Sequence, residues 1–335
     1  MRTRAEFVRD VAVFGALAPF IGCATAPERP LRGGIPADIG FDDKRKVVKR
    51  EIFVGVDSPF RALHISDTHL AFMSPGDLAE ADEGRRWLYE RRKDRFPDAL
   101  FSFAAALDYA RREHIALFHT GDLVDYVSAE NLRLAEEALK GMDVLAAPGN
   151  HEYNWHMRAR PWNEDLSAVR ARVAPHFPNA MDCVARTVNG VNFIAFDNGD
   201  YNVSSEQAAR IDAELDRGLP SVLLCHVPFF TRELFDAVRS WRSTWDILRY
   251  GGGRLAYLMG ATDADMADYP ENRRIEQHAS DVTLGFVERC RHRKNLKAIL
   301  CGHLHRETCA RFSPTAIEYV ADANFKGVCY DITFI

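Results

Sequence analysis

Short apolar runs alternate with charged stretches along most of the chain. The apolar runs have the length of strands and lie at residues 62–66, 115–120, 144–147, 191–196, 221–225 and 297–301. Between them, residues 97–113 and 129–140 show the clearest helical spacing of apolar positions. Strands that alternate with helices predict an α/β fold in which helices cover a sheet.

The C-terminal region has a different pattern. Residues 316–321 and 327–334 alternate between apolar and polar positions, which predicts half-exposed strands. Fully parallel sheets are buried on both faces, so we expect a mixed sheet. Gly251-Gly252-Gly253 lacks the Lys-Ser/Thr pair of a phosphate-binding loop and predicts a turn.

Residues 1–26 have the organisation of an export signal. Three arginines precede an apolar run at residues 11–22, which is shorter than the about 20 residues that a bilayer span needs. Phe20-Ile21-Gly22-Cys23 resembles a lipoprotein box, and Ala24-Thr25-Ala26 resembles an ordinary signal-peptidase site. We therefore expect an exported protein, either periplasmic or anchored to the membrane by a lipid. The alternative is an amphipathic N-terminal helix on a cytoplasmic protein.

The remaining chain divides into a linker and one domain. Residues 27–45 contain three Pro and three Gly without apolar periodicity, as a linker does. The folded domain is expected at residues 46–335. Within it, residues 227–301 separate two chemistry-bearing segments, far more than the about 4 to 6 residues of an ordinary loop. We expect a cap insertion at about residues 228–296.

Composition narrows the classes of partner. The chain has 335 residues, of which 47% are hydrophobic and 27% charged, so it is a globular protein rather than a disordered or fibrous one. The formal net charge of −5 gives no general attraction to nucleic acid. Seven Cys without a CxxC pair exclude a disulfide scaffold or a zinc ribbon.

Five segments place His, Asp or Asn directly after strand-like runs. They are Ser66-Asp67-Thr68-His69, Gly121-Asp122-Leu123-Val124-Asp125, Gly149-Asn150-His151-Glu152, His226 and Gly302-His303-Leu304-His305. Ligands bind at the carboxyl ends of strands in open α/β sheets, so these segments are expected to meet at one rim. Carboxylate, amide and imidazole ligands together suit Mn, Fe or Zn.

Together, the segments D-x-H, G-D-x-x-D, G-N-H-E, H and G-H-x-H over residues 62–305 resemble the calcineurin-like metallophosphoesterase superfamily. The resemblance implies a two-sheet α/β sandwich flanked by helices. It also implies a binuclear metal centre and a small phosphoester substrate. Residues 63–70 are similar to the bacterial branch that cleaves cyclic nucleotides and glycerophosphodiesters.

The resemblance implies a ligand for each metal position. The two ions are divalent or trivalent transition metals. One is held by Asp67, His69, Asp122 and His305, and the second by Asp122, Asn150, His226 and His303. Two such ions acidify a shared water to a hydroxide, which attacks phosphorus.

Further residues receive catalytic and binding roles from the resemblance and from their position. His151 adjoins the ligand Asn150 and is expected to protonate the leaving group, with Asp125 orienting its ring. Tyr153 and Trp155 follow His151 and are candidates for walls of the substrate site.

Departures from the family's branches bear on the substrate. Protein phosphatases of the superfamily carry Arg at the positions of Tyr126 and Pro148, where it clamps a phosphoryl group. Without these clamps we expect a small phosphodiester rather than a phosphoprotein, and a phosphomonoesterase is the alternative. A nuclease acting on duplex DNA needs a basic face. The net charge of −5, without a block of Lys or Arg, argues against a nuclease here. A non-catalytic binding module would have lost ligands, and all are present.

Three other features predict structural roles. Residues 81–95, rich in Arg, Asp and Glu, predict a solvated helix face. Cys225 and Cys301 end apolar strands and predict buried thiols. The aromatic residues of the insertion predict its own small core, and they are Phe229, Phe230, Trp241, Trp245, Tyr250 and Tyr257.

Overall fold

Two β-sheets form the centre of the protein. The computed structural model describes residues 45–153, 165–241 and 255–335. The first sheet has the order β1-β11-β2-β3-β4, with β1 (Lys46–Ile52), β2 (Phe60–Ile65), β3 (Ala116–Thr120), β4 (Val144–Ala147) and β11 (Val328–Phe334). The second has the order β5-β6-β7-β8-β10-β9, with β5 (Cys183–Val188), β6 (Val191–Phe196), β7 (Ser221–Leu224), β8 (Leu296–Cys301), β9 (Thr308–Arg311) and β10 (Ile317–Val320).

Both sheets are mixed, as the sequence predicts. In the first, β2, β3 and β4 are parallel, and β11 pairs antiparallel with β2 and parallel with β1. In the second, β6, β7, β8 and β10 are parallel, with β5 and β9 antiparallel at the two edges. The parallel strands place their carboxyl ends at a common edge in each sheet.

Aromatic packing joins the two sheets. Phe118 of β3 and Phe193 of β6 have ring centroids 4.8 Å apart, and Phe334 of β11 lies 5.1 Å from Phe193. All three are fully buried in a cluster that includes side chains of both sheets. Burial of such large apolar side chains is the main favourable contribution to stacking the sheets.

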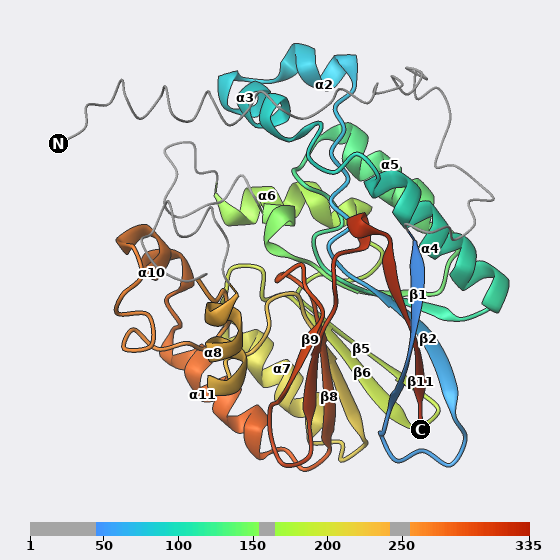
Figure 1. Ribbon diagram of the computed structural model, residues 1–335, viewed down its shortest axis with the longest axis vertical. Coiled ribbons are helices and arrows are strands. Elements are labelled where there is room, and N and C mark those ends of the chain that lie inside the picture. The colour runs from blue at the N-terminus through green and yellow to red at the C-terminus, as the bar shows by residue number, and fades with distance from the viewer. Residues whose placement is uncertain (1–44, 154–164, 242–254) are drawn as a thin grey trace, which may run out of the picture. The chain divides into compact units, whose positions relative to one another are not determined.

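Helices cover the outer face of each sheet (Figure 1). The first sheet packs against α4 (Ala99–Glu113) and α5 (Ala129–Leu139), through a cluster that includes Leu63, Phe103 and Leu134. The second packs against α7 (Ser205–Leu215), α8 (Arg232–Ser240) and α11 (Asp281–His292). The fold is therefore the two-sheet α/β sandwich flanked by helices that the sequence predicts.

Shorter elements complete the described chain. They are α2 (Pro75–Glu80), α3 (Glu83–Arg92), α6 (Leu166–Val173), α10 (Glu271–Gln277) and the 3₁₀ turns η1 (Asn150–Tyr153), η2 (Ala174–His176) and η3 (Asn324–Lys326). The helix starts follow capping chemistry: Ser74 accepts from the backbone N–H of Asp77, and Asp77 accepts in return from Ser74.

The expected strands and helices are confirmed, with one difference in burial. The sequence predicts a half-exposed strand at residues 327–334, but only Thr333 of β11 is not fully buried. The polar residue that suggests exposure is Asp331, which accepts hydrogen bonds from Arg61 Nε at 2.9 Å and Tyr109 Oη at 2.8 Å. A buried strand that contains a paired carboxylate therefore has the same polar–apolar alternation in its sequence as a half-exposed strand.

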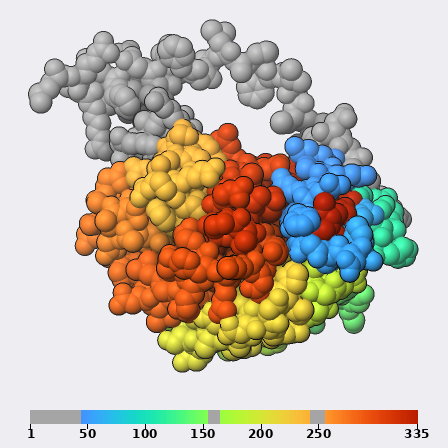
Figure 2. Space-filling model, turned by 90° about the horizontal axis from the view of Figure 1, so that it is seen from below, coloured from blue at the N-terminus to red at the C-terminus, as the bar shows by residue number. Residues whose placement is uncertain are grey.

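The C-terminal residue lies beside the loop that joins β1 and β2. The backbone N–H groups of Val54 and Gly55 donate to the Ile335 carbonyl at 2.6 and 2.9 Å. Figure 2 shows the red end of β11 enclosed by the blue residues of this region. These bonds close the end of the first sheet.

The segment at residues 228–296 shares the core of the second sheet. Phe229 is fully buried there, and Phe230, Trp241 and Tyr257 pack against the same cluster as partly buried side chains. These aromatic residues are thus core residues, but of the sheet as well as of the insertion. The insertion's role as a cap stays a prediction, and Trp245 and Tyr250 lie outside the described residues.

The expected export signal at 1–26, nearly all of the linker and Gly251-Gly252-Gly253 also lie outside the described residues. Export stays a prediction that the intact mass of the native protein tests. Among the helices of the described ranges, none combines the length and the apolar character needed to cross a bilayer.

Candidate metal centre

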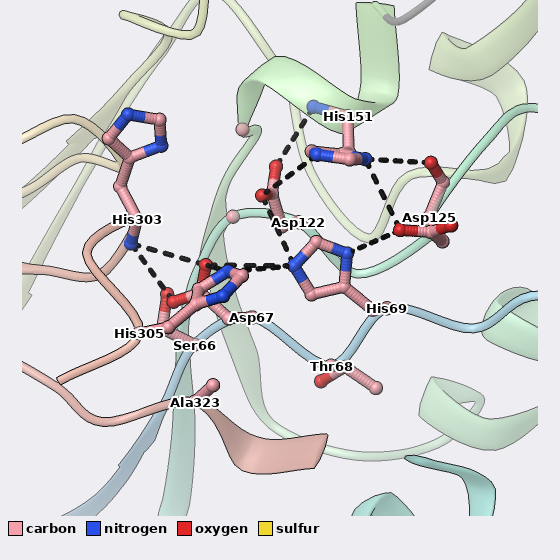
Figure 3. A network of polar contacts seen from close by, with 12 residues as sticks. Ser66, Asp67, Thr68, His69, Asp122, Asp125, His151, His303, His305 and Ala323 are labelled. Atoms are coloured by element: carbon pink, nitrogen blue, oxygen red, sulfur yellow. Dashed lines mark hydrogen bonds and ion pairs between the residues drawn. The ribbon is translucent and has the colours of Figure 1, made fainter. Parts of the chain in front are cut away.

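The five chemistry-bearing segments meet at the carboxyl ends of five strands. Asp67 and His69 follow β2, Asp122 and Asp125 follow β3, and Asn150 and His151 follow β4. The second sheet contributes His226 after β7, and His303 and His305 after β8. Figure 3 shows residues from both sheets pointing toward one another. The predicted rim is therefore formed by the edges of two sheets.

Four donors form a first group around His69. Asp67, His69, Asp122 and His305 each offer one atom, and these atoms lie within 4.8 Å of one another. His69 Nε2 is 3.0 Å from His305 Nε2 and 3.5 Å from Asp122 Oδ2, and His305 Nε2 is 3.1 Å from Asp67 Oδ1. Two ligand atoms bound at about 2.1 Å to one ion at right angles lie about 3.0 Å apart, so this spacing fits a shared ion.

A second group forms around His226. Its Nε2 atom lies 3.2 Å from Asp122 Oδ2, 3.1 Å from Asn150 Oδ1 and 3.1 Å from His303 Nδ1. The donor atoms of Asp122, His226 and His303 also lie within 4.8 Å of one another. Asp122 is the member common to both groups, which is the position of a bridging carboxylate.

In His69 and His226, one ring nitrogen donates a hydrogen bond and leaves the other ring nitrogen free to bind metal. His69 Nδ1 donates to Asp125 Oδ1 at 2.8 Å, and His226 Nδ1 donates to the Thr120 carbonyl at 2.7 Å. Each bond places the proton on Nδ1 and directs the lone pair of Nε2 into the site. Tyr201 Oη lies 3.1 Å from His303 Nε2 and can fix the opposite tautomer there. The donor set fits two transition-metal ions.

Five of the expected ligands have left-handed backbone conformations. Their φ angles are 55° for Asp67, 54° for His69, 55° for Asp122, 69° for His303 and 51° for His305. This conformation costs roughly 1 to 2 kcal/mol for a residue with a Cβ atom. Strain of this kind persists where surrounding contacts over-determine the backbone, and it concentrates at functional sites.

Glycines of the motifs make room for the ligands. A Cβ atom at Gly302 would lie 1.8 Å from Ser66 Oγ and 2.4 Å from Asp67 Oδ2. At Gly149 it would lie 2.3 Å from Asp122 Oδ1. No side chain fits at these positions, because the loops cross directly beneath the acidic donors.

His151 lies beside the two donor groups. Its Nδ1 donates to the backbone carbonyl of Asp125 at 2.7 Å, and its Nε2 faces Asp122 Oδ2 at 4.0 Å (Figure 3). Asp125 thus positions His151 mainly through its carbonyl, whereas its carboxylate bonds His69 and lies 3.4 Å from His151 Nδ1. Burial lowers the pKa of His151 to about 4.

Arg92 is a site residue that the sequence does not reveal. Residues 81–95 predict only a solvated face, and this is wrong for Arg92, whose Nε and Nη2 atoms donate to both oxygens of Asp125. Although burial opposes it, the bonds from Arg92 and His69 hold the pKa of Asp125 below its usual range. Arg92 ends α3, and no local pattern distinguishes it from the neighbouring arginines.

Two buried polar residues tie the loops together from below. Glu152 accepts backbone N–H bonds from Asp122 at 3.1 Å, Val124 at 3.1 Å and Gly149 at 2.6 Å. Burial, followed by repulsion from Asp122, raises the pKa of Glu152 to about 7. His119 accepts from the Gly121 N–H at 3.2 Å and lies 3.0 Å from Thr68 Oγ1. Glu152 can be found from the sequence because it is the Glu of the G-N-H-E motif. No motif marks His119.

The expected wall residues have different outcomes. Tyr153 is 2% exposed, and its hydroxyl donates to Asp197 at 2.9 Å. The ring points inward because Tyr153 ends the 3₁₀ turn η1, so it anchors that turn instead of facing a substrate. Trp155 lies outside the described residues.

The geometry agrees with what comparison of the sequence shows. The family model for calcineurin-like phosphoesterases matches residues 60–307. The chain belongs to this family. This calcineurin-like phosphoesterase is therefore a metal-dependent hydrolase of phosphoesters. None of the curated proteins matches it by sequence.

The solved structures that match this phosphoesterase have low sequence identity to it. A dimetal phosphatase from Danio rerio has 12% identity and a TM-score of 0.44, with 80% of this chain and 88% of that chain covered. The phosphopantetheinyl hydrolase from Mycobacterium tuberculosis has 12% identity and a TM-score of 0.39, with 83% and 91% covered. A 5'-nucleotidase from Candida albicans has 12% identity and a TM-score of 0.38, with 84% and 47% covered.

Proposed function

We propose that the protein hydrolyses small phosphodiesters with two ions of Mn, Fe or Zn. The observation that carries the proposal is the shared oxygen Asp122 Oδ2, which lies 3.5 Å from His69 Nε2 and 3.2 Å from His226 Nε2. A buried carboxylate between two imidazole groups is suited to bridge two cations, because its charge offsets their repulsion.

Each donor group would hold one ion. Asp67, His69, Asp122 and His305 would bind the first, and Asp122, Asn150, His226 and His303 the second. When bound, the two ions supply an acidified water as nucleophile and stabilise the charge on the phosphoryl oxygens. Asp125 and Thr120 keep two of the imidazoles in the tautomer that binds metal.

His151 would give a proton to the leaving group. Its Nδ1–H is committed to the Asp125 carbonyl, so proton exchange takes place at Nε2, on the side of the donor groups. Burial keeps the ring neutral near pH 7 in the free protein, because it lowers the pKa to about 4. A bound phosphoryl anion beside Nε2 favours the protonated form, which supplies the acid for an alkoxide.

Two buried residues support a diester over a monoester. Tyr126 and Pro148 stand where related protein phosphatases carry arginines, and neither side chain is cationic. A dianionic monoester therefore has fewer cationic partners here than a protein phosphatase gives it. A monoanionic diester needs fewer such partners.

The test compares methyl p-nitrophenyl phosphate with p-nitrophenyl phosphate on the metal-loaded protein. Both release p-nitrophenolate, so the ratio of their kcat/KM values reports the preference for a diester or a monoester. We expect the diester to be preferred. A monoester advantage of more than about tenfold, or about 1.4 kcal/mol, would overturn the diester assignment in favour of a phosphomonoesterase.

Two variants assign the hydrolysis to this site. Asp122→Asn removes the bridging charge and should abolish hydrolysis of both esters. Asp143→Asn removes an exposed carboxylate that pairs with Arg186, and should leave both rates unchanged. Equal activity of the two variants would place the hydrolysis elsewhere.

A further inference from the structure

The loop that follows β6, residues 197–201, lies beside the second donor group without contributing an expected ligand. β6 is parallel to β7, so this β6 loop stands at the same edge of the sheet as His226. Its side chains at 197, 198 and 201 are buried and polar, and buried polar groups need hydrogen-bond partners. The partners lie in the segments that carry the three ligands of the second group alone, which are Asn150, His226 and His303.

Asn198 holds the backbone at His226. Its side chain is fully buried, and Oδ1 accepts the N–H groups of His226 and Val227, both at 3.0 Å. Its Nδ2 donates to the Val227 carbonyl at 2.7 Å, and the His226 carbonyl accepts the Gly302 N–H at 3.1 Å. Without the Asn198 amide, two N–H groups and a carbonyl would lose their partners in a buried place, so this turn would have to shift.

Tyr201 holds the ring of His303. The Nδ1 atom of His303 faces His226 Nε2 at 3.1 Å, so its Nε2 carries the proton and donates to Tyr201 Oη at 3.1 Å. The Tyr201 ring packs in the core cluster of the second sheet, and its backbone N–H donates to the Asn198 carbonyl at 2.9 Å. The hydroxyl therefore has a fixed position, and it orients the imidazole of His303.

The same loop packs against the turn that carries Asn150. A Cβ atom at Gly199 would lie 2.7 Å from the Gly149 carbonyl oxygen and 3.1 Å from the Asn150 nitrogen. Asp197 joins the two segments, because Oδ1 accepts the Gly199 N–H and Oδ2 accepts the Tyr153 hydroxyl, both at 2.9 Å. Tyr153 and Asn150 belong to the same 3₁₀ turn, η1. The β6 loop thus touches all three of these ligand segments.

We propose that the β6 loop positions the ligands of the second ion, with Asn198 acting through His226 and Tyr201 acting through His303. This inference rests on the proposed function, because it requires two bound ions. Among the described residues, neither side chain forms a hydrogen bond with the ligands expected for the first ion alone, Asp67, His69 and His305. Loss of either residue should therefore weaken the second ion selectively.

The test measures binding of Mn²⁺ to the wild type, Asn198→Ala and Tyr201→Phe by titration calorimetry. Hydrogen bonds that orient metal ligands are commonly worth about 10- to 100-fold in metal affinity. We expect each variant to bind the second ion about 10- to 100-fold more weakly and the first with unchanged Kd. Tyr201→Phe removes one hydroxyl and keeps the packing of the ring, so it tests the inference even where Asn198→Ala does not fold.

Electron paramagnetic resonance gives a second readout that does not depend on activity. Two neighbouring Mn²⁺ ions interact magnetically, whereas a single bound ion shows the resolved hyperfine lines of an isolated centre. At a Mn²⁺ concentration that just fills both sites of the wild type, the two variants should show the isolated-ion spectrum. An interacting pair in both variants would contradict the inference.

Two control variants match the burial and the lost hydrogen bonds. Asn192→Ala removes a buried amide near the start of β6, whose Nδ2 donates to Glu214 Oε2 at 3.0 Å. Tyr269→Phe removes a buried hydroxyl that donates to the Ala256 carbonyl at 3.0 Å. Both should bind the two ions with wild-type affinity. Weakening of the second ion by the controls to the same extent would reduce the effect to general destabilisation and overturn the inference.

A double variant tests whether Asn198 acts through His226. His226→Ala removes a ligand of the second ion and should bind one Mn²⁺. Adding Asn198→Ala to this protein should leave the Kd of the remaining ion unchanged, because the pathway to the second ion is already broken. A further fall in affinity would show that Asn198 supports the whole site, and the assignment to the second ion would be wrong.

The wild-type titration separates this inference from the proposed function. If the wild type binds two ions and both Asn198→Ala and Tyr201→Phe bind them equally well, the β6 loop has no positioning role and the proposed function stands. If the wild type binds fewer than two ions in excess Mn²⁺, the two-ion function fails, and the inference fails with it.

Discussion

At the scale of single residues, His151 offers a test of proton transfer that is separate from metal binding. His151→Ala removes the Nε2 donor and leaves every expected ligand in place. We expect turnover of an ester with an alkoxide leaving group to fall by about 10²- to 10⁴-fold. The defect should be smaller for a p-nitrophenyl ester, because p-nitrophenolate leaves without a proton. Rates on both esters and the metal content of the variant are the measurements.

A surface histidine supplies the control for this prediction. His176 pairs with Glu136 at 2.7 Å on an exposed surface, and His176→Ala should leave both rates unchanged. Defects of equal size on the two esters of His151→Ala would contradict a role in proton donation and indicate a binding role.

Glu318 is a buried carboxyl group that makes the stability of the folded protein depend on pH. It is fully buried in β10, its Oε1 accepts the Phe229 N–H at 2.6 Å, and its Oε2 has no hydrogen-bond partner among the described residues. Burial raises its pKa to about 8. The neutral form is thus favoured in the folded protein, and its stabilising contribution is complete below the unfolded pKa of about 4.3.

This contribution is lost as the pH rises toward the folded value of about 8. Glu318→Gln keeps the shape and stays neutral, so it should unfold at higher urea concentration than the wild type at pH 9, and at a similar one at pH 4. The control is Glu51→Gln, which alters an exposed strand carboxylate. A wild-type advantage at pH 9 would disprove the buried neutral form.

At the scale of elements, the loop after β8 depends on a glycine for space rather than for conformation. The φ angle of Gly302 is not in the left-handed region, so alanine meets no backbone strain there. Its Cβ atom would nevertheless lie 1.8 Å from Ser66 Oγ. Gly302→Ala should therefore displace His303 and His305 from the loop after β2. We expect metal loss and an activity loss of about 100-fold or more, with a native circular dichroism spectrum.

The matched control for Gly302 lies in α2. A Cβ atom at Gly76 would make an ordinary contact with Ser74 Oγ at 3.5 Å, so Gly76→Ala should keep metal content and activity. Full activity in Gly302→Ala would show that the loops after β2 and β8 need not approach this closely for catalysis.

How well elements can be predicted from the sequence follows from how local their signals are. Buried parallel strands such as β4 and β7 are short, almost entirely apolar runs, and the residues after them mark the site. β11 misleads because Asp331 is satisfied by Arg61 and Tyr109, partners that are remote in sequence. Arg92 is missed for the same reason, since Asp125 lies 33 residues away.

At the scale of the whole molecule, the metal centre joins the two sheets. Asp67, His69, Asp122 and Asn150 extend from the first sheet, and His226, His303 and His305 extend from the second. The sequence predicts that these residues share one rim, because each follows a strand. The pattern along the chain does not assign each segment to one of the two sheets, because strand order depends on pairings between distant segments.

Metal removal should therefore weaken the association of the sheets. The site holds three buried carboxylates, Asp67, Asp122 and Asp125, together with five left-handed residues, and bound cations offset the repulsion between the charges. Metal at 100 times its Kd stabilises a folded protein by about 2.7 kcal/mol. An unfolding entropy of about 2.1 cal/mol/K per residue gives roughly 1.4 °C per kcal/mol for a chain of 335 residues, so chelation should lower Tm by about 4 °C.

Asp122→Asn distinguishes this effect from unspecific binding of metal. Without its bridging charge the variant should show little change in Tm on chelation, because it no longer holds both ions. Scanning calorimetry of both proteins, with and without chelator, gives the four Tm values. An equal fall in Tm for the two proteins would mean that the stabilising ions bind outside this centre, and the link between the sheets would then have to come from the aromatic core alone.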